Sequence, residues 1–93
     1  MNSVYILYSK KLDSFYIGET ENLAERIDQH NSGFYNKAYT KKANDWELFY
    51  TFTSESKSQA LKIERHIKKM KSKIYIWNLK KYPEMTEKLK KLK

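Results

Sequence analysis

Two short apolar runs, separated by only a few polar residues, most constrain how this chain can fold. Val4–Tyr8 and Phe15–Ile17 are rich in β-branched and aromatic residues, which favour strands. Ser9–Asp13 between them carries two lysines and an aspartate and is typical of a turn, although it contains no glycine. We therefore expect a β-hairpin in which Tyr5 and Tyr16 come near each other across the ladder.

A capped helix is expected directly after the hairpin. Asn22 is a favoured N-cap residue with a glutamate three residues later, as in a capping box, and Thr20 is a rival cap. The helix is predicted to reach about Asn31. At roughly 100° per residue, Arg26 and His30 lie on or beside its apolar face, so both side chains are expected to lean towards the protein interior.

The connections around this helix also carry information. Gly18 is expected to permit a sharp turn or a close approach to a ligand, because glycine lacks a Cβ. Gly33–Asp45 is polar and basic and is long for a connection in a small domain, which suggests a functional loop. The third strand is predicted over Trp46–Thr53. Its apolar face is expected to consist of Trp46, Leu48, Tyr50 and Phe52.

A second capping box begins the longest predicted helix. Ser56 is its N-cap, and the helix is expected to reach about Met70. On this helix Glu64 falls inward or at the edge of the apolar face, where the structural alternative to a functional role is an i,i+4 salt bridge with Lys68. The apolar face itself is predicted to contain Ala60, Ile63, Ile67 and Met70.

The last third of the chain predicts two further short helices. Ile74–Leu79 is apolar and is interpreted as a short helix that packs Trp77. A basic helix over about 83–93 begins at a proline, which suits a first helical turn. Taken together, three strands and several helices indicate one α+β (mixed α/β) domain over residues 1–93, with a core over about 3–79.

The charge balance points to a polyanionic partner. The chain has 19 Lys and Arg residues against 11 Asp and Glu residues, a net charge of +8. Such a field favours nucleic acid, although a lysine-rich solvated surface would have the same composition. The absence of cysteine excludes disulfides and thiolate metal sites and fits the cytoplasm. No apolar run is long enough to span a membrane.

The polar side chains singled out above suit the cleavage of a phosphodiester. Arg26 offers a planar fork of donors that matches a phosphate. Glu64 offers one hard carboxylate, and magnesium sites commonly use one or two carboxylates together with water and substrate phosphate. Tyr5, Tyr16 and His30 could position or deprotonate a water, and the residues alone leave open which of them is the base.

The order of these residues resembles the GIY-YIG nuclease superfamily. The order is V-Y-I, then Y-I-G, then R-x-x-x-H, then a glutamate on a later helix. The motif tyrosines are 11 residues apart, the arginine follows 10 residues later and the histidine 4 after that, similar to homing endonucleases and repair incision domains. The match runs from Val4 to Leu79, with Val4 in place of the first motif's glycine. The phrases A-Y-T-K-K and W-E-L-F-Y resemble the small, single-domain bacterial branch.

This resemblance implies a fold and a role for the residues of the hairpin and first helix. The family fold is a three-stranded antiparallel sheet flanked by helices, in agreement with the predicted elements. Tyr5 and Tyr16 match the tyrosines that orient the attacking water. Arg26 matches the arginine that contacts the scissile phosphate, and His30 matches a position that assists proton transfer.

The resemblance also implies a metal site. Glu64 matches the sole carboxylate ligand of a single Mg²⁺ or Mn²⁺ ion, and Asn78 lies near the position of an active-site asparagine in several members. These positions imply a GIY-YIG-type endonuclease that hydrolyses phosphodiester bonds of DNA with low sequence specificity. Such an enzyme would be structure-selective or would act in DNA repair. Because relatives often add separate DNA-binding domains, a protein partner that supplies specificity is also expected.

Basic and aromatic residues outside the motifs are candidates for sequence-independent contacts to DNA. The predicted nucleic-acid contacts are Lys10, Lys11, Lys37, Tyr39, Lys41 and Lys42. Tyr35 or Tyr39 is a candidate for stacking on an unpaired base. Two hypotheses from other classes stay open: a non-catalytic nucleic-acid-binding module that keeps the fold, and an adaptor that binds proteins through its basic C-terminal helix.

Overall fold

The central strand of a small sheet organises the fold. A computed structural model of the chain describes residues 1–32 and 42–92. The strand β1 (Asn2–Ser9) pairs antiparallel with β2 (Ser14–Thr20) on one side and with β3 (Glu47–Ser54) on the other, in the order β2-β1-β3. Four residues at the centre of β1 are at most 1% exposed: Val4, Tyr5, Ile6 and Leu7. The predicted three-stranded antiparallel sheet is confirmed.

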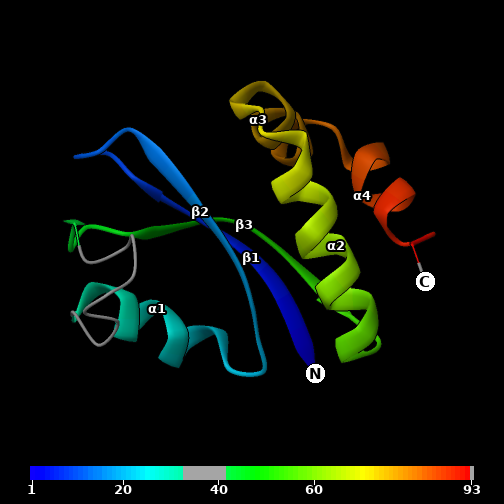
Figure 1. Cartoon of the computed structure of the whole chain (residues 1–93), viewed down its shortest axis with the longest axis horizontal. Coiled ribbons are helices and arrows are strands. Elements are labelled where there is room, and N and C mark those ends of the chain that lie inside the picture. The colour runs from blue at the N-terminus through cyan, green and yellow to red at the C-terminus, as the bar shows by residue number, and fades with distance from the viewer. Residues whose placement is uncertain (33–41, 93) are drawn as a thin grey trace.

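Helices cover the two faces of this sheet unequally. Figure 1 shows α1 (Leu23–Asn31) on one face of the sheet. On the other face lie α2 (Lys57–Met70), α3 (Lys73–Lys81) and α4 (Pro83–Leu89). Since successive strand residues point to opposite faces, the sheet contributes side chains to two separate clusters.

The larger cluster lies between the sheet and the helices α2, α3 and α4. Its buried members are Val4, Ile6, Phe52, Ala60, Ile63, Ile67, Ile76, Leu79 and Leu89. The smaller cluster lies on the α1 face and consists of Tyr5, Leu7, Ala43 and Trp46, with Leu23 and Ile27 of α1 packed against it. The α1 face therefore carries the motif tyrosines, whereas most of the apolar stabilisation lies on the other face.

The predicted helix starts are confirmed. The side chain of Asn22 accepts a hydrogen bond from the backbone N–H of Glu25 at 3.1 Å, so Asn22 and not Thr20 is the N-cap of α1. Ser56 caps α2 in the same way by accepting from the N–H of Gln59 at 3.1 Å. Among residues 1–32 and 42–92, no helix combines the length and apolar character needed to cross a bilayer.

The hairpin turn forms without glycine because an aspartate takes the left-handed conformation. Asp13 has φ 49°, a region that aspartate tolerates better than most residues. Its carboxylate accepts a hydrogen bond from the Tyr8 hydroxyl at 2.7 Å, and its carbonyl accepts one from Lys73 of α3 at 2.8 Å. The turn is therefore held both by its own strand and by a helix distant in sequence.

The single apolar face predicted for β3 is wrong. Tyr50 and Leu48 pair with consecutive residues of β1, so Phe49 between them is an extra residue and forms a β-bulge. Beyond the bulge, Phe52 joins the larger cluster, whereas Trp46 before it lies in the cluster on the α1 face. Because of the extra residue, the side chains after the bulge point to the opposite face from the one that strict alternation predicts. A sequence pattern with a period of two does not anticipate this change.

Two apolar residues predicted to be packed inside lie at the surface. Met70 is 44% exposed at the end of α2, where Lys71 with φ 48° terminates the helix. Trp77 is 53% exposed, and α3 instead buries Ile76 and Leu79. The run that forms α3 is too short for its apolar face to be deduced from periodicity.

The packing of α2 on the sheet leads to a prediction about stability. Ile63 is fully buried, so Ile63→Ala should lower the free energy of unfolding by about 2–5 kcal/mol through lost burial and a residual cavity. Leu61, on the same helix, is 37% exposed, and Leu61→Ala should change it by less than about 1 kcal/mol. Urea unfolding of both variants measures the difference, and equal effects would contradict the assignment of this core.

Candidate active site

Tyr5 and Gly18 approach each other closely at the centre of the α1 face. Tyr5 pairs directly with Gly18 across the β1–β2 ladder. A Cβ at position 18 would lie 2.5 Å from Cζ of the Tyr5 ring, well inside van der Waals contact. Gly18 therefore makes room for the tyrosine ring within a regular strand, and the expected sharp turn at this residue is wrong.

The space above Gly18 lets Tyr5 reach a histidine from α1. The Tyr5 hydroxyl and Nε2 of His30 are 3.0 Å apart and share a hydrogen bond. Tyr16 lies diagonally across the ladder from Tyr5, with ring centroids 6.4 Å apart, and its ring centroid is 4.8 Å from that of His30. Tyr5 and His30 are 1% and 2% exposed, while Tyr16 is half-buried. The structure thus brings together three of the predicted site residues.

An asparagine fixes the position of His30 on the sheet. Asn31, the next residue, donates from Nδ2 to the Trp46 carbonyl at 2.9 Å and accepts from the Trp46 N–H at 2.7 Å. These two bonds tie the end of α1 to the residue that precedes β3. The Trp46 ring in turn lies 6.5 Å from that of Tyr16. This positioning role was not predicted, because nothing local in the sequence links Asn31 to a residue 15 positions away.

The environment of His30 keeps its imidazole neutral near neutral pH. Burial, and secondarily the positive charge of Arg26 one turn earlier on α1, lowers the pKa of His30 from 6.5 to about 4. A neutral imidazole has one nitrogen that can accept a proton. His30 is therefore available as a hydrogen-bond acceptor near neutral pH, and the same lowered pKa makes it a weaker base than an ordinary histidine.

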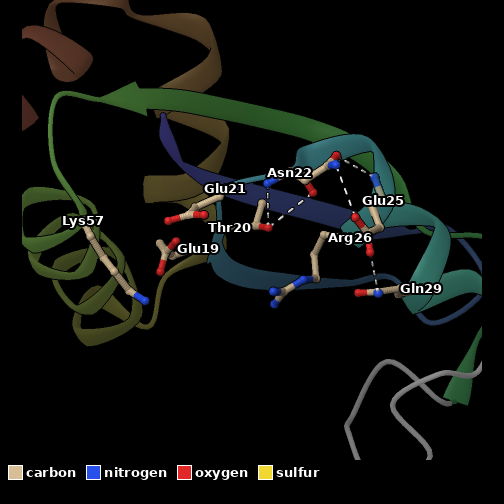
Figure 2. A pocket seen from close by; sticks show the side chains of 8 residues that line it. All are labelled: Glu19, Thr20, Glu21, Asn22, Glu25, Arg26, Gln29 and Lys57. Carbon is tan, nitrogen blue, oxygen red and sulfur yellow. Dashed lines mark hydrogen bonds between the residues drawn. The ribbon is translucent and has the colours of Figure 1, made fainter.

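Arg26, one helical turn before His30 on α1, lines a cavity of about 390 Å³ whose lining residues do not include Tyr5, Tyr16 or His30. In Figure 2 its side chain reaches from α1 into this space, and Lys57 enters it from the start of α2. Glutamates also line the space, so two cations face a partly acidic wall. The full lining is Glu19, Thr20, Glu21, Asn22, Glu25, Arg26, Gln29 and Lys57.

The other two predicted catalytic residues lie on the helices of the opposite face. Glu64 is on α2, where its side chain is 16% exposed and its carboxylate accepts a hydrogen bond from Lys68 at 2.6 Å. Asn78 is half-buried on α3, and its backbone carbonyl accepts from the N–H of Tyr82 at 2.8 Å. Within the described part of the chain, no hydrogen bond or ion pair joins either side chain to His30.

The described residues offer few ligands for a divalent ion. Residues 1–32 and 42–92 contain no cluster of three or more His, Asp or Glu side chains that could enclose a metal. Mg²⁺ often binds proteins through one or two carboxylates and completes its octahedron with water and substrate phosphate. The single carboxylate of Glu64 fits such a site, provided that its ion pair with Lys68 opens.

The predicted DNA-contacting lysines are only partly described. Lys10 and Lys11 are exposed in the hairpin connection, and Lys42 is exposed shortly before β3. The other predicted DNA contacts, Lys37, Tyr39 and Lys41, lie outside the described residues. The stacking candidate Tyr35 also lies outside them. The described lysines place positive charge at the turn of the hairpin and at the start of β3.

The arrangement of the hairpin, α1 and the later helices agrees with a comparison against protein families. Residues 1–82 match the GIY-YIG catalytic domain. The chain belongs to the GIY-YIG family. It is 37% identical over 83 residues to a UPF0213 protein of Syntrophus aciditrophicus (strain SB), covering 89% of this chain and 94% of that protein. It is 43% identical over 70 residues to a UPF0213 protein of Clostridium perfringens (strain 13 / Type A), covering 75% and 73%. No solved structure matches the chain.

Membership confirms the predicted family and gives a coarse function. A GIY-YIG catalytic domain is a nuclease-type domain, and GIY-YIG nucleases act on DNA. The names of the two relatives state no reaction.

The contact between Gly18 and Tyr5 gives a prediction about stability. Gly18→Ala should lower the free energy of unfolding by about 1–3 kcal/mol, because the added methyl group displaces the Tyr5 ring. In a Tyr5→Leu background, Gly18→Ala should lower the free energy of unfolding by a smaller amount, because the tyrosine ring is absent. Urea unfolding of the two single variants and the double variant measures this coupling. Additive effects would show that the ring contact is not the cause.

The buried neutral His30 gives a prediction about pH. Its folded-state pKa of about 4 lies below the ordinary value of 6.5, so between these values the unfolded state binds a proton that the folded state does not. The contribution of neutral His30 to the free energy of unfolding is complete above pH 6.5. It falls by about 3 kcal/mol as the pH drops to 4.

The measurement is urea unfolding at pH 7 and pH 4.5. In wild type the free energy of unfolding should decrease between pH 7 and pH 4.5. In His30→Gln this decrease should be smaller, because glutamine does not titrate. Leu61→Ala, which changes an exposed apolar residue on α2, is the control and should keep the wild-type decrease. An unchanged decrease in His30→Gln would mean that His30 is not the titrating group.

Proposed function

We propose that this protein is a DNA endonuclease that hydrolyses phosphodiester bonds with low sequence specificity and depends on a single Mg²⁺ or Mn²⁺ ion. The observation that carries the proposal is the buried, hydrogen-bonded pair of Tyr5 and His30 with Tyr16 at its edge, one helical turn from Arg26. A proton acceptor and a permanent cation on one face are what attack by water on a phosphate requires.

The geometry supports a division of roles within the cluster. Tyr16 is the more exposed tyrosine, so it is the group that contacts and orients the attacking water. Tyr5 and His30 lie behind it, and the neutral imidazole takes up the proton through the Tyr5 hydroxyl. The water oxygen bonds to phosphorus while the bond to the leaving oxygen breaks, and the leaving oxygen takes a proton from solvent to become the hydroxyl end of the cut strand. Arg26 stabilises the negative charge that grows on the phosphate.

The metal ligand in this proposal is Glu64. A bound divalent ion would polarise a phosphate oxygen as a Lewis acid. Glu64 offers one hard carboxylate on α2, and Lys68 must release it before it can act as a ligand. Asn78 on α3 is proposed as an auxiliary polar group of the site.

The proposed DNA contacts explain the low specificity. Lys10, Lys11 and Lys42 are exposed and can contact phosphates, which carry no sequence information. We further propose that a protein partner supplies specificity. The protein would act on DNA in the cytoplasm, and this action would include DNA repair.

A second candidate is a nucleic-acid-binding module without catalytic activity. The observation that favours it is the ion pair between Glu64 and Lys68, in which the only proposed metal ligand is already occupied. Such an i,i+4 pair is worth only about 0.3–0.5 kcal/mol, so a divalent ion can displace it. The strength of the pair therefore does not decide between the two candidates, and a cleavage assay does.

The deciding experiment is nicking of supercoiled plasmid and cleavage of branched oligonucleotides with and without Mg²⁺ or Mn²⁺. Wild type should cut only with metal. Arg26→Ala and Glu64→Ala should each lower the rate by about 100-fold or more, because each removes a group that stabilises the transition state. The matched control is Glu87→Ala, which removes a glutamate paired with Lys90 on the C-terminal segment and should cut like wild type.

The outcomes separate the candidates. Equal cleavage by wild type and Glu64→Ala would remove Glu64 from the metal site. An absence of cleavage by every variant, with salt-sensitive DNA binding intact, would favour the binding module. Metal-dependent cleavage that both Arg26→Ala and Glu64→Ala lose would support the nuclease.

A further inference from the structure

A second aromatic surface lies on α3, away from the tyrosine–histidine cluster. Trp77 is 53% exposed and Ile74, three residues earlier, is 74% exposed, although both are large apolar side chains. The other tryptophan of the chain, Trp46, is only 2% exposed. Single exposed apolar side chains are common on free surfaces, but tryptophan is enriched at the centres of binding interfaces.

The Trp77 ring is held in place from below. Its centroid lies 4.9 Å from that of Phe49 and 6.2 Å from that of Phe15, and both pairs are nearly perpendicular, at 85° and 87°. Phe15 and Phe49 also contact each other edge-on at 5.0 Å. Two packed rings therefore orient the tryptophan while about half of it stays exposed.

Lysines lie before and after this ring on α3. The α3 sequence K-I-Y-I-W-N-L-K-K contains three lysines and no acidic residue. Lys73, Lys80 and Lys81 lie four residues before and three and four residues after Trp77, so they share its side of the helix. Lys80 places its Nζ 4.6 Å from the Phe49 centroid, and Lys73 is bound to Asp13 in the hairpin turn. The exposed side of α3 is thus aromatic at its centre and cationic at its C-terminal end, whereas Lys73 at the other end is paired with Asp13.

We propose that the exposed side of α3, formed by Lys73, Ile74, Trp77, Lys80 and Lys81, binds an unpaired nucleotide of a nucleic acid strand. Trp77 stacks on the base, and the lysines contact the adjoining phosphates. Every base has a face that can stack on an aromatic ring, and flanking cations bind the backbone. The lysines would also attract an acidic protein, and this alternative is an outcome of the test below. We call these five residues the α3 platform.

The α3 platform is joined to the candidate active site through one strand. Phe15, which supports Trp77, directly precedes Tyr16 in β2, and their side chains point to opposite faces of the sheet. The inference rests on the proposed function in taking DNA as the substrate, and it deepens that function. It names DNA with unpaired nucleotides, such as a flap or a gap, as the preferred class.

The test is a binding titration in EDTA, so that no DNA is cut. Two labelled oligonucleotide duplexes of equal length are compared, one fully paired and one with an unpaired segment. Trp77→Leu should weaken binding of the unpaired form by about five- to 100-fold and that of the paired form by less than about twofold. Trp77→Phe keeps a ring and should lose less. Leu61→Ala, which changes an exposed residue on α2, is the control and should bind like wild type.

Tryptophan emission gives an independent readout. The emission of wild type minus that of Trp77→Phe isolates the exposed ring, because both proteins keep the buried Trp46. This difference signal should be quenched by the unpaired DNA and not by poly-glutamate. Circular dichroism of each variant verifies that it folds.

Several outcomes would overturn the α3 platform. The proposal is wrong if Trp77→Leu binds the unpaired form as tightly as wild type, or if poly-glutamate alone quenches the difference signal, which would indicate an acidic protein partner. Nicking that persists alongside such a result would leave the nuclease proposal standing. Conversely, binding that depends on Trp77 in a protein that cuts no DNA would support the platform and refute the nuclease.

Discussion

The α1 face of this protein depends on the close approach of the Tyr5 ring to Gly18. Because position 18 has no Cβ, the ring can occupy space that a side chain on β2 would otherwise fill. Its hydroxyl then lies 3.0 Å from His30, and the two bonds between Asn31 and Trp46 hold α1 at that distance from the sheet. One missing methyl group and one asparagine thus place a buried proton acceptor beside a half-buried tyrosine.

The sheet separates two kinds of surface. On the α1 face, burial keeps His30 neutral, and the neighbouring guanidinium of Arg26 adds to this effect. On the opposite face, the large apolar cluster anchors α2 and α3, which carry Glu64 and the exposed Trp77. In the proposed mechanism the proton acceptor is on α1 and the metal ligand is on α2, and both helices are oriented by packing against the same three strands.

Local sequence signals predicted the secondary structure well because they act over a few residues. The capping residues Asn22 and Ser56 begin their helices as predicted, since a cap bonds to an N–H only three positions away. The bulge at Phe49 was missed because it depends on how β3 pairs with β1, more than 40 residues away in the sequence. The exposure of Trp77 was missed because a helix of nine residues shows too few turns to define its buried side.

The sequence by itself determined the family, the three-stranded antiparallel fold and the identity of the candidate residues, because motif spacing and strand and helix signals are properties of the chain. Only the tertiary structure decided which of these residues meet. It joined Tyr5, Tyr16 and His30, paired Glu64 with Lys68, and left Trp77 at the surface. Such contacts depend on strand register and helix packing, which arise from interactions between segments far apart in the sequence.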